Sequence, residues 1–308
     1  MATTGTTSFN LDVNDLIEEA FERCGSQVRS GYDFRTARRS LNLLTVEWAN
    51  KGINLWTIEQ GVIPMVTGQA VYPLPINTID LLDQVIRQNN GTTNQIDINI
   101  NRISESTYST IPNKLTQGRP IQVWINRQSG ATNATTVTLA ADISSSDTTI
   151  TLSSTANLAS SGFIIIGNET ISYPNVSGNQ LLNCARGQNN TTAAAYTSGA
   201  AISVTNLPSI NVWPTPNSPG NQYMFVYWRL RRIQDAGDGV NTEDIPFRFL
   251  NAMVAGLAYY LSIKLQGVDQ NRILGLKADY DQQFQLAADE DREKASIRFV
   301  PRNMSYTR

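Results

Sequence analysis

The sequence predicts an α+β fold, in which N- and C-terminal helices form a helical bundle beside a small antiparallel β region, and an all-β domain is inserted. Apolar residues repeat at helical spacing near both ends of the 308-residue chain, while strand-like alternation dominates the middle. Residues 130–205 differ again, because they carry only four charges and are rich in β-branched residues, Gly, Ser and Asn. We therefore predict a core made of residues 1–129 and 206–308, into which the β domain of residues 130–205 is inserted.

Each end of the chain contributes two predicted helices. Residues 12–24 and 33–51 each start at an aspartate suited to cap a helix, carry one apolar face, and stop before a glycine. Residues 244–266 open with an Asp-Ile-Pro sequence and repeat apolar residues at spacings of three and four. A last helix is expected over residues 273–287.

Short strands are expected between these helices. Residues 55–64 and 69–72 have strand character on either side of a Thr-Gly turn, with Pro64 at an edge or a strand end. Residues 83–88 and 96–100 flank a turn-rich segment, which predicts one hairpin.

The inserted domain is expected to interrupt a second hairpin. Ser104 is suited to cap a short helix, and residues 120–126 then form a strand. A similar strand follows the insertion at residues 209–214, as if the loop between two paired strands had grown into a domain. One more strand is expected over residues 223–230.

The composition argues against several classes of function. Twenty-four basic residues nearly balance 26 acidic ones, so the chain has no broad positive field for nucleic acid or anionic membranes. It has no histidine, and no pair of carboxylates stands out, so we expect neither an enzyme nor a metal or cofactor site. Cys24 and Cys184 are expected to be free thiols. No apolar run has the length of about 18 residues that spans a membrane, and no signal peptide is evident, which favours a soluble protein.

The inserted domain carries a pair of motifs. Residues 162–173 read G-F-I-I-I-G-N-E-T-I-S-Y, and residues 184–192 read C-A-R-G-Q-N-N-T-T. The pair resembles a small, Ig-like β insertion that is common in structural proteins of tailed bacteriophages, which implies a virion protein. Arg186 could bind a carboxylate or phosphate ligand, but the favoured interpretation is that it ties loop carbonyls together. Glu169 is expected to be structural rather than a calcium ligand or an acid catalyst, because no second carboxylate is close in sequence.

The core resembles the head-to-tail adaptor family of short-tailed bacteriophages, also called connector or head-completion proteins. The segments that carry the likeness are, in chain order, residues 37–44, residues 47–52 with Leu55 and Trp56, residues 68–75, residues 212–216, and residues 244–246 at the start of a helix. The resemblance implies a homo-oligomeric ring, usually a dodecamer, that docks under the portal after DNA packaging. Genomic DNA would pass through the lumen without sequence recognition.

The same resemblance implies partners and a location. The portal would lie above the ring, and a tail nozzle with fibre or spike proteins would lie below it, with no cofactor and no membrane. The protein would be made in the host cytoplasm and reside in the virion at the head–tail interface, where it serves tail assembly and DNA ejection. Whether the inserted domain holds fibres, binds sugars or only decorates the ring is left open by the sequence.

The last residues of the chain combine basic and apolar side chains. The final 15 residues carry a charge of +4 and no acid, interleaved with large apolar residues. In the adaptor family the C-terminal arm commonly reaches the portal, so we predict that residues 296–308 are a portal-binding arm that becomes ordered only on the portal. Its contact residues would be Arg298, Phe299, Val300, Arg302, Met304, Tyr306 and Arg308. A disordered tail without a function is the alternative.

Two other functions are alternatives to the adaptor. A carbohydrate-binding tail fibre or receptor-binding protein could be built around the Ser/Thr-rich domain, although the helices would then have no role. Four tryptophans of the chain occupy positions typical of core residues, which favours packing over stacking on sugars. They are Trp48, Trp56, Trp124 and Trp213. A virion-associated peptidoglycan hydrolase would need a cleft with two carboxyl groups about 5 to 9.5 Å apart.

Overall fold

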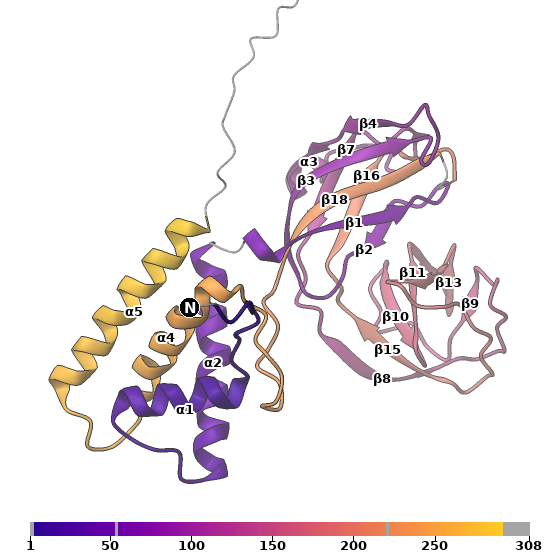
Figure 1. The fold of residues 1–308 in the computed structure, drawn as a ribbon. Helices are drawn as coiled ribbons and strands as arrows, with labels where there is room; N and C mark the ends of the chain where they lie inside the picture. Colours follow the sequence, from indigo (N-terminus) through magenta and orange to yellow (C-terminus); the bar gives the residue numbers. More distant parts are fainter. Residues whose placement is uncertain (1–2, 53–54, 220–221, 292–308) are drawn as a thin grey trace, which may run out of the picture. The chain divides into compact units, whose positions relative to one another are not determined.

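The computed structural model describes residues 3–52, 55–219 and 222–291, and it confirms a mixed α+β protein (Figure 1). By its internal contacts the chain divides into two compact units. The first combines the residues up to Trp56 with those from Ile233 onward, and the second comprises Thr57–Arg232. The boundaries expected near residues 130 and 205 do not coincide with this division, because both fall inside the second unit.

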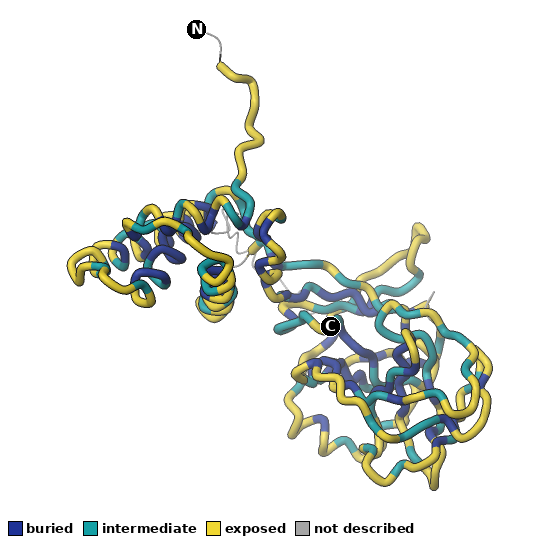
Figure 2. Tube along the Cα trace, turned by 90° about the horizontal axis from the view of Figure 1, so that it is seen from below, coloured by how far each residue is buried: buried dark blue, intermediate teal, exposed yellow. Residues whose placement is uncertain are grey.

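The first unit is helical. Its helices are α1 (Val13–Cys24), α2 (Gly31–Lys51), α4 (Leu250–Ser262), which follows the 3-10 turn η2 (Phe247–Phe249), and α5 (Gln270–Glu290). Buried and exposed residues alternate along α1, α2 and α5, as amphipathic segments require, whereas α4 is buried along most of its length (Figure 2). Their apolar faces share one hydrophobic core, whose largest side chains include Trp48, Phe249 and Tyr280.

The sequence explains most of the helix ends. Asp12 caps α1, because its Oδ1 accepts the backbone N–H of Asp15 at 2.8 Å, and α1 ends at Gly25 with a φ of +77°. The expectation that Asp33 caps α2 is wrong. The cap is Ser30, and Asp33 completes a capping box by accepting the backbone N–H of Ser30 at 3.0 Å. The third predicted helix, expected over residues 244–266, is shorter at both ends, since η2 starts at Phe247 and α4 runs from Leu250 to Ser262.

One carboxylate ties three of the helices together. Glu47 of α2 accepts hydrogen bonds from the hydroxyls of Tyr260 at 2.6 Å and Tyr280 at 3.0 Å, which belong to α4 and α5. The indole N–H of Trp48 donates to the same Tyr280 hydroxyl at 3.0 Å. The polar groups that these large side chains bring into the core are thereby satisfied.

The second unit begins with two four-stranded sheets. One has the order β1 (Ile58–Pro64), β18 (Tyr223–Arg231), β3 (Thr78–Gln88), β4 (Ile96–Asn99). The other has the order β2 (Val71–Pro73), β16 (Ser209–Trp213), β7 (Gln122–Asn126), β5 (Asn101–Arg102). Side chains of both sheets share a second core, which includes Tyr72, Ile86, Val123, Ile210 and Phe225. The short pair β6 (Gln117–Gly118) and β17 (Thr215–Pro216) is parallel.

The strand predictions are confirmed in part. The predicted hairpin is formed by β3 and β4, Ser104 caps the short helix α3 (Glu105–Ser109), and Pro64 ends the edge strand β1. Residues 55–57, however, form the 3-10 turn η1 (Leu55–Thr57) rather than the start of a strand. β1 and β2 flank the Thr-Gly turn but lie in different sheets, because the long strand β18 pairs along the whole of β1.

Residues 130–205, which we call the module, have a core of their own. The module contains β8 (Thr132–Thr138), β9 (Ile150–Thr151), β10 (Gly162–Ile166), β11 (Glu169–Tyr173), β12 (Asn175–Ser177), β13 (Gln180–Leu182), β14 (Ala185–Gln188) and β15 (Ala201–Thr205). They form sheets of order β14-β11-β10-β15-β8 and β12-β13-β9. The core is almost entirely aliphatic and includes Leu139, Ile150, Ile164, Ile171 and Ile202.

The chain enters and leaves the module side by side. The expected pairing of the flanking strands is confirmed, since β7 and β16 are antiparallel neighbours. Beyond them, the backbone N–H of Gly130 donates to the carbonyl of Asn206 at 2.8 Å. β8 and β15 then continue the pairing, with Thr132 opposite Thr205. The two connections to the module are therefore neighbouring, hydrogen-bonded segments.

Candidate functional site

The predicted portal-binding residues lie outside the described residues. They are Arg298, Phe299, Val300, Arg302, Met304, Tyr306 and Arg308. The position from which this segment departs is nevertheless fixed, because Asp291 follows α5 and is buried. One of its carboxylate oxygens pairs with the guanidinium of Arg248 in η2, and the other accepts the backbone N–H of Leu55 at 3.3 Å.

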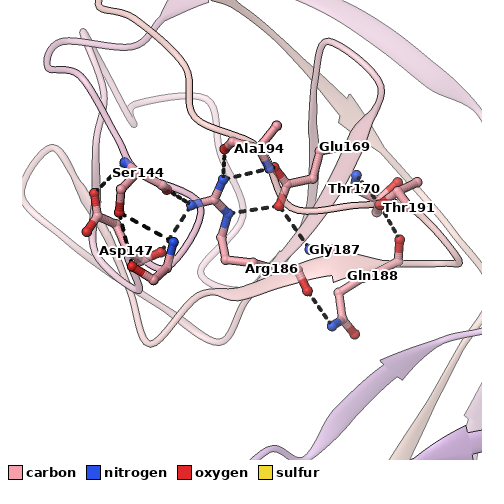
Figure 3. Close-up of polar contacts among 10 residues, drawn as sticks. Ser144, Asp147, Glu169, Thr170, Arg186, Gly187, Gln188, Thr191 and Ala194 are labelled. Carbon is pink, nitrogen blue, oxygen red and sulfur yellow. Dashed lines mark hydrogen bonds and ion pairs between the residues drawn. The ribbon is translucent and has the colours of Figure 1, made fainter.

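The module motifs meet in a buried ion pair (Figure 3). Glu169 is the first residue of β11, and Arg186 lies in the neighbouring strand β14. The guanidinium binds the carboxylate with two parallel hydrogen bonds, Nε to Oε1 and Nη2 to Oε2, both at 2.8 Å. The Arg186 side chain is 7% exposed and the Glu169 side chain 0%. Such a planar, two-point contact is the strongest geometry that these two groups can form.

The remaining N–H groups of the Arg186 side chain donate hydrogen bonds to loop carbonyls. Nη2 also donates to the carbonyl of Ala194 at 2.6 Å, while Nη1 donates to the carbonyls of Ser144 and Asp147 (Figure 3). An arginine side chain has five N–H donors, and all five are used here. The interpretation that Arg186 ties loops together is thus confirmed. The guanidinium has no donor left for an external carboxylate or phosphate.

Glu169 is equally saturated. Its Oε1 accepts the backbone N–H of Gly187 at 2.9 Å, and its Oε2 accepts that of Ala194 at 3.1 Å. Burial alone would raise the pKa of Glu169, but the hydrogen bonds from Arg186 and from these backbone groups outweigh it and hold the pKa below its ordinary value. Gly187 is also required sterically, because its φ is +59° and a Cβ would lie 3.0 Å from the carbonyl oxygen of Thr191.

The tryptophans are engaged in packing. Trp48 is buried in the helical core. The rings of Trp56 and Trp124 have centroids 4.8 and 5.4 Å from neighbouring aromatic rings. The indole N–H of Trp213 donates to a backbone carbonyl at 3.0 Å. These contacts agree with the expected packing roles.

The two cysteines are free, as expected, and both are buried. Burial raises the pKa of Cys24 to about 11 and that of Cys184 to about 12, although a nearby arginine opposes the shift in each case. Both side chains therefore stay in the unreactive thiol form near neutral pH.

Glu243 is a buried carboxyl that the sequence pattern did not reveal. Among the described residues, neither of its oxygens has a hydrogen-bond partner, and the residue is 7% exposed. Burial, together with the charges of Asp244 and Asp235, raises the pKa of Glu243 to about 7. It can thus exchange a proton near neutral pH, but its burial keeps it from acting on an external polymer.

An exposed row on α2 is a second feature that the sequence analysis missed. Its members recur every three or four residues on the side away from the core, and they are Tyr32, Arg35, Arg39, Leu43, Val46 and Asn50. Leu43 and Val46 are 52% and 48% exposed. We call this set the α2 row. The signal was present, because these residues form a second series at helical spacing beside the core series.

No set of three or more Cys, Asp or Glu residues in residues 3–52, 55–219 and 222–291 is placed to hold a metal ion. Within the same ranges no helix has the length and apolar character needed to cross a membrane.

Comparison with known proteins adds no assignment, since no family model matches this chain and no curated protein matches it in sequence.

Proposed function

We propose that this protein is a structural virion protein that forms a ring adaptor between the portal and the tail of a short-tailed phage. In this proposal the helices form the adaptor bundle, the module is an inserted domain, and DNA passes through the lumen of the ring. The observation that carries it is one helical core shared by segments near both ends of the described chain. Residues 13–48 and 233–288 contribute to this core, and all the described sheets lie between them in sequence. That is the order of elements which the resemblance to adaptors implies.

Two features of the module support its place as an insertion. It has its own aliphatic core, and its two connections are hydrogen-bonded neighbours that prolong the β7–β16 pair. An insertion at such a point leaves the pairing of the two flanking strands, β7 and β16, unchanged. It also costs little chain entropy. The Arg186–Glu169 pair supports a structural domain rather than a ligand site, because every donor of the arginine is already bound within the module.

The α2 row supports self-association. Two half-exposed apolar residues, Leu43 and Val46, lie on the same side of α2 as Arg35 and Arg39. A surface of this kind can pack against a different surface of the next copy, and repeated contacts of that type close into a ring. The portal, the tail nozzle and the fibre or spike proteins would be the other partners, with residues 296–308 as the portal arm and with no enzymatic role.

Charge substitution in the α2 row tests the proposal. The variant Leu43→Glu with Val46→Glu should stay monomeric by mass photometry and should fail to co-sediment with purified portal rings. A matched control is Leu115→Glu, which alters an apolar residue that is 70% exposed in the other unit. Ring formation and portal binding should survive in the control. Unchanged assembly of the double variant would exclude the α2 row as the ring interface, and absence of portal binding by the native protein would refute the adaptor function.

A further inference from the structure

A groove of about 730 Å³ opens on the surface of the first unit. The non-helical segment before α1 forms one side, through Phe9 and Leu11, and the start of α4 contributes Leu250 and Val254. Phe9 is 77% exposed, and Phe247 of η2, which also lines the groove, is 78% exposed. Two phenylalanine rings left in water beside a concave apolar surface indicate a place where another apolar segment is buried.

The α1 side of the groove is acidic. Besides Glu19, which pairs with Arg23 at 3.0 Å, it presents Asp15, Glu18 and Glu22. Among the residues that the structure describes, these three carboxylates have no ion-pair partner. The helix dipole favours an acid only at the start of α1, so it does not explain Glu22 in the last turn. Glu18 and Glu22 are also four residues apart, a spacing at which like charges repel.

The chain itself contains a segment of complementary chemistry. Residues 296–308 include three arginines and no acid, so their charge is +3. The groove has four carboxylates and one arginine, which gives −3. The apolar members of the segment match the phenylalanine-lined part of the groove, and they are Ile297, Phe299, Val300, Met304 and Tyr306. Basic side chains can pair with the carboxylates of the groove, and apolar side chains can be buried against its apolar residues.

The segment also departs from beside the groove. Asp291, the last described residue, pairs with Arg248, which directly follows the groove residue Phe247 in the chain. Residues 292–296 add up to about 17 Å of reach to this starting point when they are extended. Because both partners belong to one chain, their effective concentration is high.

We infer that residues 296–308 dock into this groove of their own subunit and are held there until the portal takes them. The docking itself needs only this chain, while the release step rests on the proposed function. The inference revises the expectation that the segment becomes ordered only on the portal. It makes the groove a storage site, which covers the arm's apolar residues before assembly and releases the arm to the portal afterwards.

A charge-swap experiment on the full chain tests the docking without any portal. Hydrogen exchange should show the amides of residues 297–308 exchanging about tenfold more slowly than in an unstructured peptide. Glu18→Lys with Glu22→Lys should abolish this protection, and so should Arg298→Glu with Arg302→Glu. Combining all four substitutions should restore it. Glu105→Lys, an exposed charge reversal in the other unit, is the matched control and should change nothing.

Each other outcome overturns the inference. If the amides of residues 297–308 exchange freely in the native chain, or if Glu18→Lys with Glu22→Lys leaves their protection intact, the groove does not hold the segment. If protection disappears on dilution, the segment docks on a second copy rather than on its own subunit. None of these measurements uses the portal, so their outcome does not decide whether the ring-adaptor proposal is correct.

Discussion

Arg186 and Glu169 lock the module together through two hydrogen bonds of 2.8 Å, each group buried and each fully satisfied. The pair joins neighbouring strands and, through Arg186, the carbonyls of Ser144, Asp147 and Ala194 in two loops. In a domain with only four charged residues, one ion pair therefore organises much of the irregular structure.

Removing the arginine should unfold the module selectively. Arg186→Ala leaves a buried carboxylate without its partner, and a change of this kind costs about 3 to 5 kcal/mol. Arg186→Lys keeps the charge but loses the two-point geometry, so its loss should be smaller. Hydrogen exchange measured at increasing temperature should show that amides of residues 130–205 lose their protection from exchange while the amides of the helices keep theirs. Equal stability of Arg186→Ala and the native protein would contradict the locking role.

Glu243 should make the first unit less stable as the pH rises. Its pKa is about 7 in the folded protein against 4.5 ordinarily, so the folded state holds this proton more tightly than the unfolded state. The resulting stabilisation is full below about pH 4.5 and is lost as the pH approaches 7, by up to about 3 kcal/mol. Glu243→Gln should be more stable than the native protein at pH 8 and should lack this dependence.

Chemical denaturation at several pH values measures this difference, with the exposed Glu105→Gln as the control. The native-minus-variant difference in the free energy of unfolding should fall by up to about 3 kcal/mol between pH 4.5 and 8, and it should be negative at pH 8. A difference that does not vary with pH would mean that Glu243 is not the titrating group.

The module should be removable. Because β7 and β16 pair directly and the backbone N–H of Gly130 bonds to Asn206, a short Gly/Ser turn in place of residues 130–205 can join the two strands. The shortened protein should keep its helical circular dichroism and still bind the portal, with a change in unfolding temperature of a few degrees at most for the helical unit. Loss of folding would show that the module is part of the core and not an insertion.

Much of the fold follows from local patterns. The start of α1 and the ends of α1 and α2 were predicted because aspartate and glycine act within one turn of a helix. The β3–β4 hairpin was predicted because its strands are adjacent in sequence. The wrong cap on α2 has a simple cause. Ser30 and Asp33 serve one capping box, in which either residue looks like a cap when it is considered alone.

Long-range features were harder to predict. Nothing local shows that β18 lies between β1 and β3, so the sequence did not identify the partners of β1 and β2. The groove beside Phe9 and Phe247 joins residues more than 200 positions apart, and the burial of Glu243 depends on surrounding segments that the sequence does not identify. The proposed arm residues, from Arg298 to Arg308, lie beyond the described chain and remain a prediction.

Deleting residues 296–308 should strongly weaken portal binding. Their apolar residues extend beyond α5, which ends at Glu290, and the proposal gives them the portal as their final partner. The truncated protein should stay folded by circular dichroism, and surface plasmon resonance on immobilised portal should show binding weakened at least about a hundredfold, since arms repeated around a ring act together. A variant in which the order of residues 296–308 is scrambled keeps the charge of the segment. It therefore shows whether charge alone accounts for portal binding. Unchanged affinity of the truncated protein would remove the arm from the interface.

The most direct test of the adaptor account is electron microscopy of the purified protein mixed with purified portal rings. The account predicts a second ring stacked coaxially on the portal, with an open channel through both and with one small β module per subunit in the class averages. Portal rings that remain bare, or that carry single subunits without forming a ring at saturating protein concentration, would contradict it.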